Sequence, residues 1–351
     1  MSSNKILVIG GGPAGLEAAR SVAELGGEAI LIEKRERLGG TPDREGYAKL
    51  THHWRDASEA MAELAASVTS SARVEVKYNA EVKGMSGSAG NFNVEIEAGG
   101  VAESLNVGAV IVATGFQHFD PGRATQQYNY YTFPDVVTLT DLEKMLKDHH
   151  VVRPSNGEAP KKIAFIQCVG SRDRRIGNEY CSKVCCGIAS KQAIELRELL
   201  PDSKVMIFYI DMRMYGYWEN EIYWPAQEKY KVNYVKGVIS EVLKKGDQLL
   251  IRGEDTTMGR PMEVTMDMVV LSIGMEPSAG TRAIAQTLGV KQNKYGFIEA
   301  GGEGGLDTVA TSAPGVFVAG AAAGPADLND SISMAGLAAA RAVAAAQKVA
   351  A

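Results

Sequence analysis

Cysteine is scarce in this chain, and long apolar runs are missing. Four cysteines in 351 residues exclude a disulfide-rich secreted scaffold, which needs a far denser set of bridges. The sequence has no run of about 18 apolar residues, so we predict no membrane span. The N-terminus passes from Met1 to Lys5 directly into an apolar stretch, without the pattern of a signal peptide. We therefore expect a cytoplasmic protein.

An excess of basic residues is also missing. The chain has 37 Lys and Arg against 42 Asp and Glu, a formal net charge of −5. Nucleic acid is excluded as the main partner, because binding phosphates requires clustered cations. The content of 45% hydrophobic and 23% charged residues is typical of a globular protein, and the length suits two domains.

The first forty residues contain the clearest local pattern. The apolar run Lys5–Ile9 predicts a buried parallel strand, and the glycines after it match G-x-G-x-x-G. A helix is predicted at Leu16–Leu25, and a second strand at Glu28–Ile32 ends at Glu33, the position of an acid that binds ribose hydroxyls. The helix N-terminus attracts phosphates. Because these features occur in register, they predict a dinucleotide-binding fold rather than an ordinary glycine-rich turn.

Three further motifs favour FAD over NAD. Leu38-Gly39-Gly40 follows Glu33, the run Val110–Gly115 reads VIVATG, and Gly315–Ala321 reads GVFVAGA. They resemble the motifs of the two-dinucleotide-binding-domain flavoprotein superfamily, although Ala321 replaces the usual Asp. The resemblance implies an FAD site made of Gly10, Gly12, Pro13, Ala14, Gly15, Glu33, Lys34, Gly39, Gly40, Val82, Ala113, Thr114, Gly115, Gly320, Ala321 and Ser331.

One branch of that superfamily is excluded by another absence. Its disulfide reductases carry Cys-x4-Cys just after the Gly-Gly pair. Residues 41–47 contain no cysteine here. We therefore do not expect thiol chemistry of the glutathione-reductase type next to the flavin.

A second strand–helix–strand unit is predicted at Lys162–Gln167, Gly187–Leu200 and Lys204–Ile210. Its first strand is not followed by G-x-G-x-x-G. All four cysteines stand there instead, between positions 168 and 186, with the spacing C-x12-C-x3-C-C. Because the fingerprint glycines let pyrophosphate come close, we expect NAD(P) binding in this domain to be lost or weak.

The four cysteines favour an iron–sulfur cluster. Thiolates are the ligands of such clusters, and four suit one [4Fe–4S] cube. A four-cysteine zinc site usually comes as two C-x2-C pairs, neither of which is present. A disulfide between Cys185 and Cys186 would be strained, and isolated buried cysteines would not explain the clustering. Zinc and redox-active thiols stay as alternatives.

The stretches around the cysteines, Phe165–Asp173 and Tyr180–Cys186, and the later run Gly320–Asp327 with Asp330 and Ser331, carry a more specific likeness. They resemble the flavoprotein (A) subunit of heterodisulfide reductase. Larger members of that family have additional C-x2-C-x2-C motifs, so this chain resembles the short form of heterodisulfide-reductase-like complexes in sulfur-oxidising prokaryotes. The resemblance implies that a [4Fe–4S] cluster next to FAD is held by Cys168, Cys181, Cys185 and Cys186.

The same resemblance implies a function and partners. We expect electron transfer between FAD and the cluster in sulfur or thiol–disulfide metabolism, with other heterodisulfide-reductase-like subunits as partners. Lys191 is the candidate catalytic residue, because a cation near the flavin favours its anionic reduced form; a solvated helix lysine is the alternative. The aromatic segment Tyr209–Trp224 is either a partner surface or core packing, and a homodimer is expected.

The predicted fold is α/β, with two Rossmann-like domains. The FAD domain is expected to be discontinuous, comprising residues 1–120 and 278–351. A connector at 121–160 leads to an inserted NAD-like domain at 161–277, which carries the cysteines. Two other functions stay open: a stand-alone NAD(P)H-dependent flavin oxidoreductase with a thiol or zinc loop, and a non-catalytic scaffold that holds a flavin.

Overall fold

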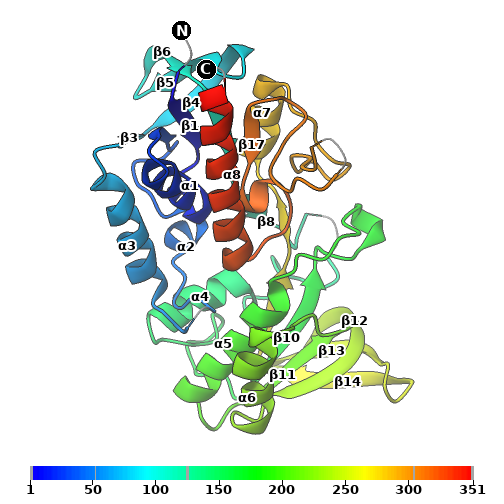
Figure 1. Ribbon diagram of the computed structural model, residues 1–351. Coiled ribbons are helices and arrows are strands. Elements are labelled where there is room, and N and C mark those ends of the chain that lie inside the picture. Colours follow the sequence, from blue (N-terminus) through cyan, green and yellow to red (C-terminus); the bar gives the residue numbers. More distant parts are fainter. Residues whose placement is uncertain (1–2, 52, 124–125, 303–304, 349–351) are drawn as a thin grey trace. The chain divides into compact units, whose positions relative to one another are not determined.

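The chain forms two compact units in a computed structural model that describes residues 3–51, 53–123, 126–302 and 305–348 (Figure 1). The first unit comprises residues 1–44, 57–117 and 276–351, and the second comprises 45–56 and 118–275. The predicted α/β class, with one discontinuous and one inserted domain, is confirmed. Residues 45–56 differ from the sequence-based boundaries, since they belong to the second unit.

A parallel five-stranded sheet forms the centre of the first unit. Its strands run in the order β17-β7-β1-β2-β3. Apolar residues fill both faces of the sheet, as expected when helices and connections cover a parallel sheet. The strands are β1 (Lys5–Ile9), β2 (Glu28–Ile32), β3 (Val74–Lys77), β7 (Ala109–Val112) and β17 (Val316–Val318).

Different elements cover the two faces of this sheet. Helices α1 (Pro13–Glu24) and α8 (Leu328–Lys348) lie side by side over one face (Figure 1), and α3 (Ala57–Thr69) packs on α1. The other face packs against α7 (Ala279–Leu288) and against an antiparallel sheet that the sequence analysis did not predict. That sheet consists of β4 (Ala80–Ser88), β5 (Asn91–Ala98) and β6 (Val101–Val107).

The second unit has a seven-stranded mixed sheet in the order β14-β13-β12-β11-β10-β15-β9. Helices α4 (Leu139–Lys147) and α5 (Cys185–Leu199) share a core with one face of the sheet. The neighbours along the stretch β12-β11-β10-β15-β9 pair in parallel. Strand β13 pairs antiparallel with β12, and β14 pairs antiparallel with β13. The strands are β9 (Val136–Thr138), β10 (Lys162–Val169), β11 (Lys204–Tyr209), β12 (Asn233–Lys245), β13 (Gln248–Asp255), β14 (Arg260–Met266) and β15 (Met268–Ile273).

Shorter elements complete the described residues. They are α2 (Gly40–Arg44), β8 (Phe116–His118), α6 (Trp224–Glu228), β16 (Met275–Pro277), the 3-10 turns Arg174–Ile176 and Gly320–Ala322, and the π turn Glu219–Tyr223. Strands β8 and β16 form a two-stranded sheet. Each of them includes a boundary at which the chain passes from one unit to the other.

The structure differs from several sequence-based boundaries. The predicted connector 121–160 contains β9, which pairs with β15. It also contains α4, where the sequence predicts a short helix at Asp141–His150; the helix begins two residues earlier, after a capping box formed by Thr138 and Asp141. Strand β9 has only two apolar residues, Val136 and Val137, followed by Thr138, which is too short a run to signal a strand. Helix α5 begins at Cys185, two residues before the predicted start. The alanine-rich run Asp330–Ala351 also predicts a helix; α8 begins at Leu328, and Ala351 lies outside the described residues.

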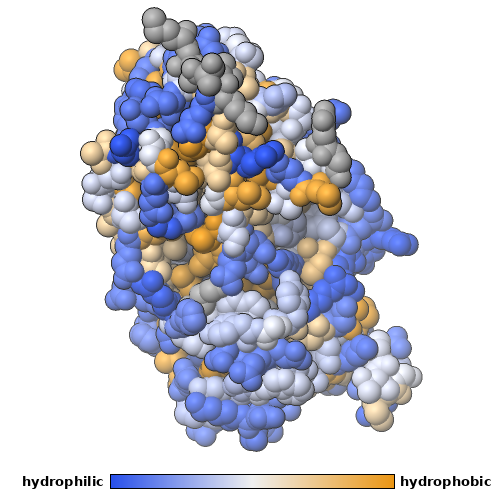
Figure 2. All heavy atoms as spheres, viewed as in Figure 1, coloured by the Kyte–Doolittle hydropathy of each residue, from blue (hydrophilic) through white to orange (hydrophobic). Residues whose placement is uncertain are grey.

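The described helices include none that is both long and apolar enough to cross a membrane. Helix α8 has 21 residues, many of them alanine. Its buried alanines pack against the first sheet, and its Leu337 is 43% exposed. On the face of the molecule shown in Figure 2, hydrophilic residues predominate and apolar ones are interspersed among them.

Candidate functional site

The glycine-rich turn after β1 has no room for side chains at two of its glycines. Gly10 has a φ of +111°, and a Cβ there would lie 2.5 Å from the backbone oxygen of Ala113. A Cβ on Gly15 would collide with the backbone oxygen of Gly10. Gly12 is the N-cap of α1, with Pro13 at the first helical position. The turn therefore brings the N–H groups at the start of α1 close to the end of β1, the arrangement that binds phosphate.

The other predicted flavin motifs meet at this turn. Gly39 donates its N–H to the Gly11 oxygen at 2.9 Å, and a Cβ on Gly40 would lie 2.6 Å from the Cα of Gly12. From the C-terminal motif, Gly320, with a φ of +64°, has room for no Cβ because Ala14 would be 2.8 Å away. Motifs that are about 300 positions apart in the chain thus surround the N-terminus of α1, as a dinucleotide site requires.

Glu33 organises this turn. Its side chain is buried, and its carboxylate accepts hydrogen bonds from the Gly11 N–H at 2.7 Å and the Arg35 N–H at 3.0 Å. The Arg35 guanidinium lies 3.4 Å from the same carboxylate. Lys34 beside it is exposed. The role of Glu33 in binding ribose hydroxyls stays a prediction, since the observed partners are protein groups.

The remaining flavin candidates also lie in the first unit. Val82 is half-buried in β4, and Ala321 is buried in the 3-10 turn before α8. The Ser331 hydroxyl donates to the Asp327 carbonyl at 2.8 Å. The Thr114 hydroxyl is 2.8 Å from the Thr281 hydroxyl. This contact of Thr281 was not predicted; the Ser-x-x-Thr sequence at the start of α7, where Ser278 accepts the Thr281 N–H, was the available signal.

The cysteines surround one loop of the second unit. Cys168 lies in β10 with a φ of +63°, Cys181 lies in the loop, and Cys185 and Cys186 are the first two residues of α5. All four are free thiols. The backbone N–H of Lys183 donates to the Cys181 sulfur at 3.3 Å. The loop therefore brings three segments that carry sulfur to the N-terminus of one helix.

Side chains fasten this loop to Met275, the first residue of β16. The Tyr180 hydroxyl donates to the Met275 carbonyl at 2.8 Å, and the Ser182 oxygen accepts the Met275 N–H at 2.8 Å. Ser182 and Ser171 hydrogen-bond to each other at 2.5 Å, and both are buried. Arg172 and Lys183 adopt positive φ values of 56° and 64°, which are uncommon for residues with a Cβ. Such conformations persist only when the surroundings impose them, and they occur often at functional sites.

The thiols influence one another electrostatically. Burial raises the pKa of Cys168, which the neighbouring Arg172 cation partly offsets. Burial, together with the other three thiols, raises the pKa of Cys185 well above its ordinary value. Burial also raises the pKa of Cys186 to about 11. Four sulfurs within each other's electrostatic reach suit a positively charged metal group, which would favour their thiolate forms.

The fit of a metal group can be tested on the described residues. They contain no group of three or more His, Cys, Asp or Glu side chains placed to hold a metal ion. Two other observations fit a polar group that spans the four thiols. Gln167, next to Cys168, has a buried amide with no partner among the described residues, and α5 has no side-chain cap at Val184. Cysteine thiolates are the ligands of iron–sulfur clusters, so the chemistry of these four donors fits such a group.

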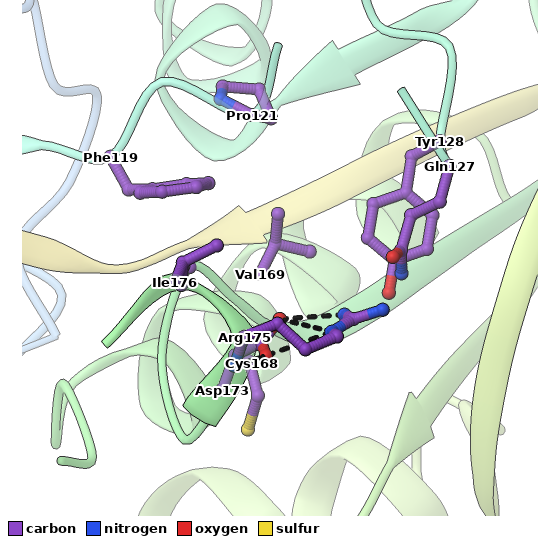
Figure 3. Close-up of a pocket in the computed structure, with 10 residues that line it drawn as sticks. Phe119, Pro121, Gln127, Tyr128, Cys168, Val169, Asp173, Arg175 and Ile176 are labelled. Atoms are coloured by element: carbon purple, nitrogen blue, oxygen red, sulfur yellow. Dashed lines mark hydrogen bonds and ion pairs between the residues drawn. The ribbon is translucent and has the colours of Figure 1, made fainter. Parts of the chain in front are cut away.

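A small hollow lies on another side of Cys168 (Figure 3). Phe119, Val169 and Tyr128 line it, together with Arg175, whose guanidinium pairs with Asp173. Figure 3 shows that the Cys168 sulfur points away from Phe119 and Val169. The hollow is therefore not the space into which this thiol projects.

Lys191 belongs to α5, and its side chain is buried, so it is not a solvated helix lysine. Its ammonium donates to Glu143 at 2.5 Å and to the Lys49 carbonyl at 2.8 Å, and lies 3.2 Å from Glu195. Glu143 also accepts the Ala48 N–H at 2.9 Å. This buried cluster joins α5, α4 and segment 45–56. Whether Lys191 also acts on a flavin stays a prediction.

Comparison with known proteins identifies relatives of the whole chain. The A subunit of the H2:CoB–CoM heterodisulfide,ferredoxin reductase of Methanothermobacter marburgensis is 33% identical over 97% of this chain. An iron–sulfur A subunit of the CoB–CoM heterodisulfide reductase of Methanopyrus kandleri is 31% identical, also over 97%. The chain spans only 63% and 64% of the length of these two relatives.

Solved structures show the fold alone, because their sequence identity is low. The thioredoxin reductase of T. acidophilum has a TM-score of 0.64 and 18% identity, covering 97% of this chain and 99% of that one. The thioredoxin reductase of Lactococcus lactis has a TM-score of 0.64 and 16% identity, covering 99% and 100%. The model of the pyridine nucleotide-disulphide oxidoreductase family matches residues 4–347, and this match supports FAD as a cofactor. The chain therefore belongs to the pyridine nucleotide-disulphide oxidoreductase family and is an oxidoreductase by class.

Proposed function

We propose that this protein is the flavin and iron–sulfur electron-transfer subunit of a heterodisulfide-reductase-like complex. The observation that carries the proposal is the loop after β10. There, four mutually interacting thiols occupy the position at which a second dinucleotide fold would carry its phosphate-binding glycines. The same chain has a complete glycine-rich turn after β1.

The residues of each unit have separate tasks in this proposal. The turn after β1, with Glu33, would bind and orient FAD, and Cys168, Cys181, Cys185 and Cys186 would hold a [4Fe–4S] cluster. FAD can exchange electrons either in pairs or one at a time and a cluster exchanges them singly, so both together would convert between the two modes. The Lys183 N–H and the uncapped start of α5 supply partial positive charge to anionic sulfur.

The partners follow from the relatives. Their names describe subunits of heterodisulfide reductases, and we infer similar partner subunits and sulfur or thiol–disulfide metabolism for this chain. Tyr215, Tyr217 and Trp224 are 61%, 43% and 46% exposed, and aromatic side chains are enriched in interface cores. These exposures support a homodimer, for which light scattering should give twice the chain mass of 37.5 kDa.

The test is the composition of anaerobically purified protein. We expect about four iron and four acid-labile sulfide per FAD, the content of one four-cysteine cluster, and an EPR signal after dithionite reduction. Cys186→Ser should lower the iron content and leave the FAD content unchanged, because the two cofactors have different ligands in different units. Glu33→Ala should reduce the FAD content and leave iron unchanged, which makes it the reciprocal control.

Other compositions would overturn the proposal. Zinc in place of iron, or metal-free protein with four titratable thiols, would indicate the thiol or zinc loop of a flavin oxidoreductase. A cluster that dithionite cannot reduce would instead indicate a scaffold without electron transfer.

A further inference from the structure

Gln167 is a buried amide without protein partners. It is 6% exposed, and among the described residues neither its amide nitrogen nor its amide oxygen has a hydrogen-bond partner. Leaving both atoms of a buried amide unsatisfied destabilises a fold, and such groups are rare in native proteins. The amide is therefore a candidate contact for a group that the protein binds.

The strand pattern indicates where this amide lies. In β10, Ile163 and Phe165 belong to the same apolar core as Cys185, whereas Ala164 and Ile166 belong to the core on the other face. Side chains two residues apart in a strand point to the same face. The pairing of β10 with β15 shifts register between Ile166 and Val169, and both of these residues belong to the core on the other face. Gln167 directly follows Ile166, and successive side chains of a strand point to opposite faces, which places it toward the face that α5 covers. Cys168 comes next in the chain, and the first turn of α5 carries Cys185 and Cys186.

We propose that the Gln167 amide donates a hydrogen bond to the sulfur of the group that the four cysteines hold. This inference rests on the proposed function and makes Gln167 a positioning residue outside the ligand set. Hydrogen bonds to cluster sulfur help to set the reduction potential. A donor is attracted more strongly to the reduced, more negative state, so Gln167 raises the potential of the cluster.

The first test uses the loaded protein. Gln167→Leu keeps a similar volume and removes the donor. At a fixed applied potential, EPR should show that the ratio of reduced to oxidised cluster in this variant is about tenfold lower than in the unchanged protein. For a one-electron couple, this difference corresponds to a midpoint potential about 59 mV lower. Gln167→Glu, of almost the same shape but with a negative charge, should lower the midpoint at least as far. Gln227→Leu is the control, since the Gln227 nitrogen is also unpartnered but lies in α6.

The second test measures the thermal stability of the protein without its cluster, where the same substitution should be stabilising. In cluster-free chain prepared by chelation, Gln167→Leu should melt at a higher temperature than the unchanged protein, because an apolar side chain replaces two unsatisfied polar atoms. A residue with a purely structural role would lower the melting temperature in both forms.

The outcomes separate this inference from the function on which it rests. Unchanged protein without iron would overturn the proposed function. Unchanged protein with a reducible cluster, together with a Gln167→Leu midpoint equal to that of Gln227→Leu, would overturn the role of Gln167 alone. A lower melting temperature of cluster-free Gln167→Leu would also overturn it, because the amide would then have a protein partner.

Discussion

At the scale of single residues, Gly15 shows how one position controls the flavin turn. A Cβ there would collide with the backbone oxygen of Gly10, which has no freedom to move because Gly10 directly follows β1. We predict that Gly15→Ala lowers the free energy of unfolding by about 1–3 kcal/mol, as overpacking does. It should also reduce the FAD retained after gel filtration, since the turn would no longer present its N–H groups.

The matched control for this change is Gly280→Ala in α7. The nearest atom to a Cβ there is the Ser278 hydroxyl oxygen at 3.6 Å. Alanine is favoured over glycine in a helix by roughly 0.5–1 kcal/mol, so this variant should be neutral or slightly stabilised and keep its FAD. Equal FAD retention by both variants would show that the close contact at Gly15 is not required.

Residues whose chemistry depends only on their neighbours in the chain were predictable from the sequence. The glycines could be predicted because their spacing reflects a turn, and the cysteines because all of them fall between positions 168 and 186. The partners of Lys191 could not be predicted. Glu143 and the Lys49 carbonyl are 48 and 142 positions away, and the sequence has no feature that links them.

At the scale of elements, this buried cluster joins α4, α5 and segment 45–56. Removing the cation with Lys191→Met would leave the carboxylates of Glu143 and Glu195 buried together. Breaking a buried ion pair in this way costs about 3–5 kcal/mol. We predict a loss of this size in urea unfolding at pH 8. The exposed Lys204→Met in β11 is the control and should change little.

The loss should depend on pH, with a definite sign. In the native protein, burial and the Glu143 charge already raise the pKa of Glu195, and Lys191 opposes the shift. Without Lys191, the Glu195 carboxyl would bind a proton still more tightly in the folded than in the unfolded state, so stability falls as pH rises above the ordinary carboxyl range. The destabilisation should therefore be smaller at pH 5 than at pH 8. The same loss at both values would contradict the proposed burial of two unpaired carboxylates.

Elements were predictable from the sequence to different degrees. The strand β1 and the strand β2 have the predicted bounds because they are continuous apolar runs. The runs Lys231–Val235 and Val238–Leu243 predict two strands, but both contribute to the single 13-residue strand β12. Gly237 interrupts the apolar pattern without ending the pairing. The sheet β4–β6 was not predicted, although the alternation of buried and exposed residues in β5 is the pattern of a half-buried strand and was an available signal. Most of β6 is exposed and gives no such signal.

At the scale of the whole molecule, the arrangement of two dinucleotide folds in one chain was predictable, because each begins with a buried parallel strand. Segment 45–56 was not assigned correctly. It joins the second unit through the Ala48 N–H and the Lys49 carbonyl, which are backbone groups and so leave no trace in the sequence.

The family description names pyridine nucleotides, and the second unit predicts how this chain differs. A nicotinamide cofactor needs a glycine-rich turn between β10 and α5. That position is occupied by a loop that Tyr180 and Ser182 fasten to Met275. We predict that NADH or NADPH, added anaerobically in excess, leaves the flavin absorbance unchanged, whereas dithionite bleaches it. Rapid bleaching by either nucleotide would show that the fold still binds nicotinamide without the fingerprint glycines, and electrons would then enter this protein without the help of any partner.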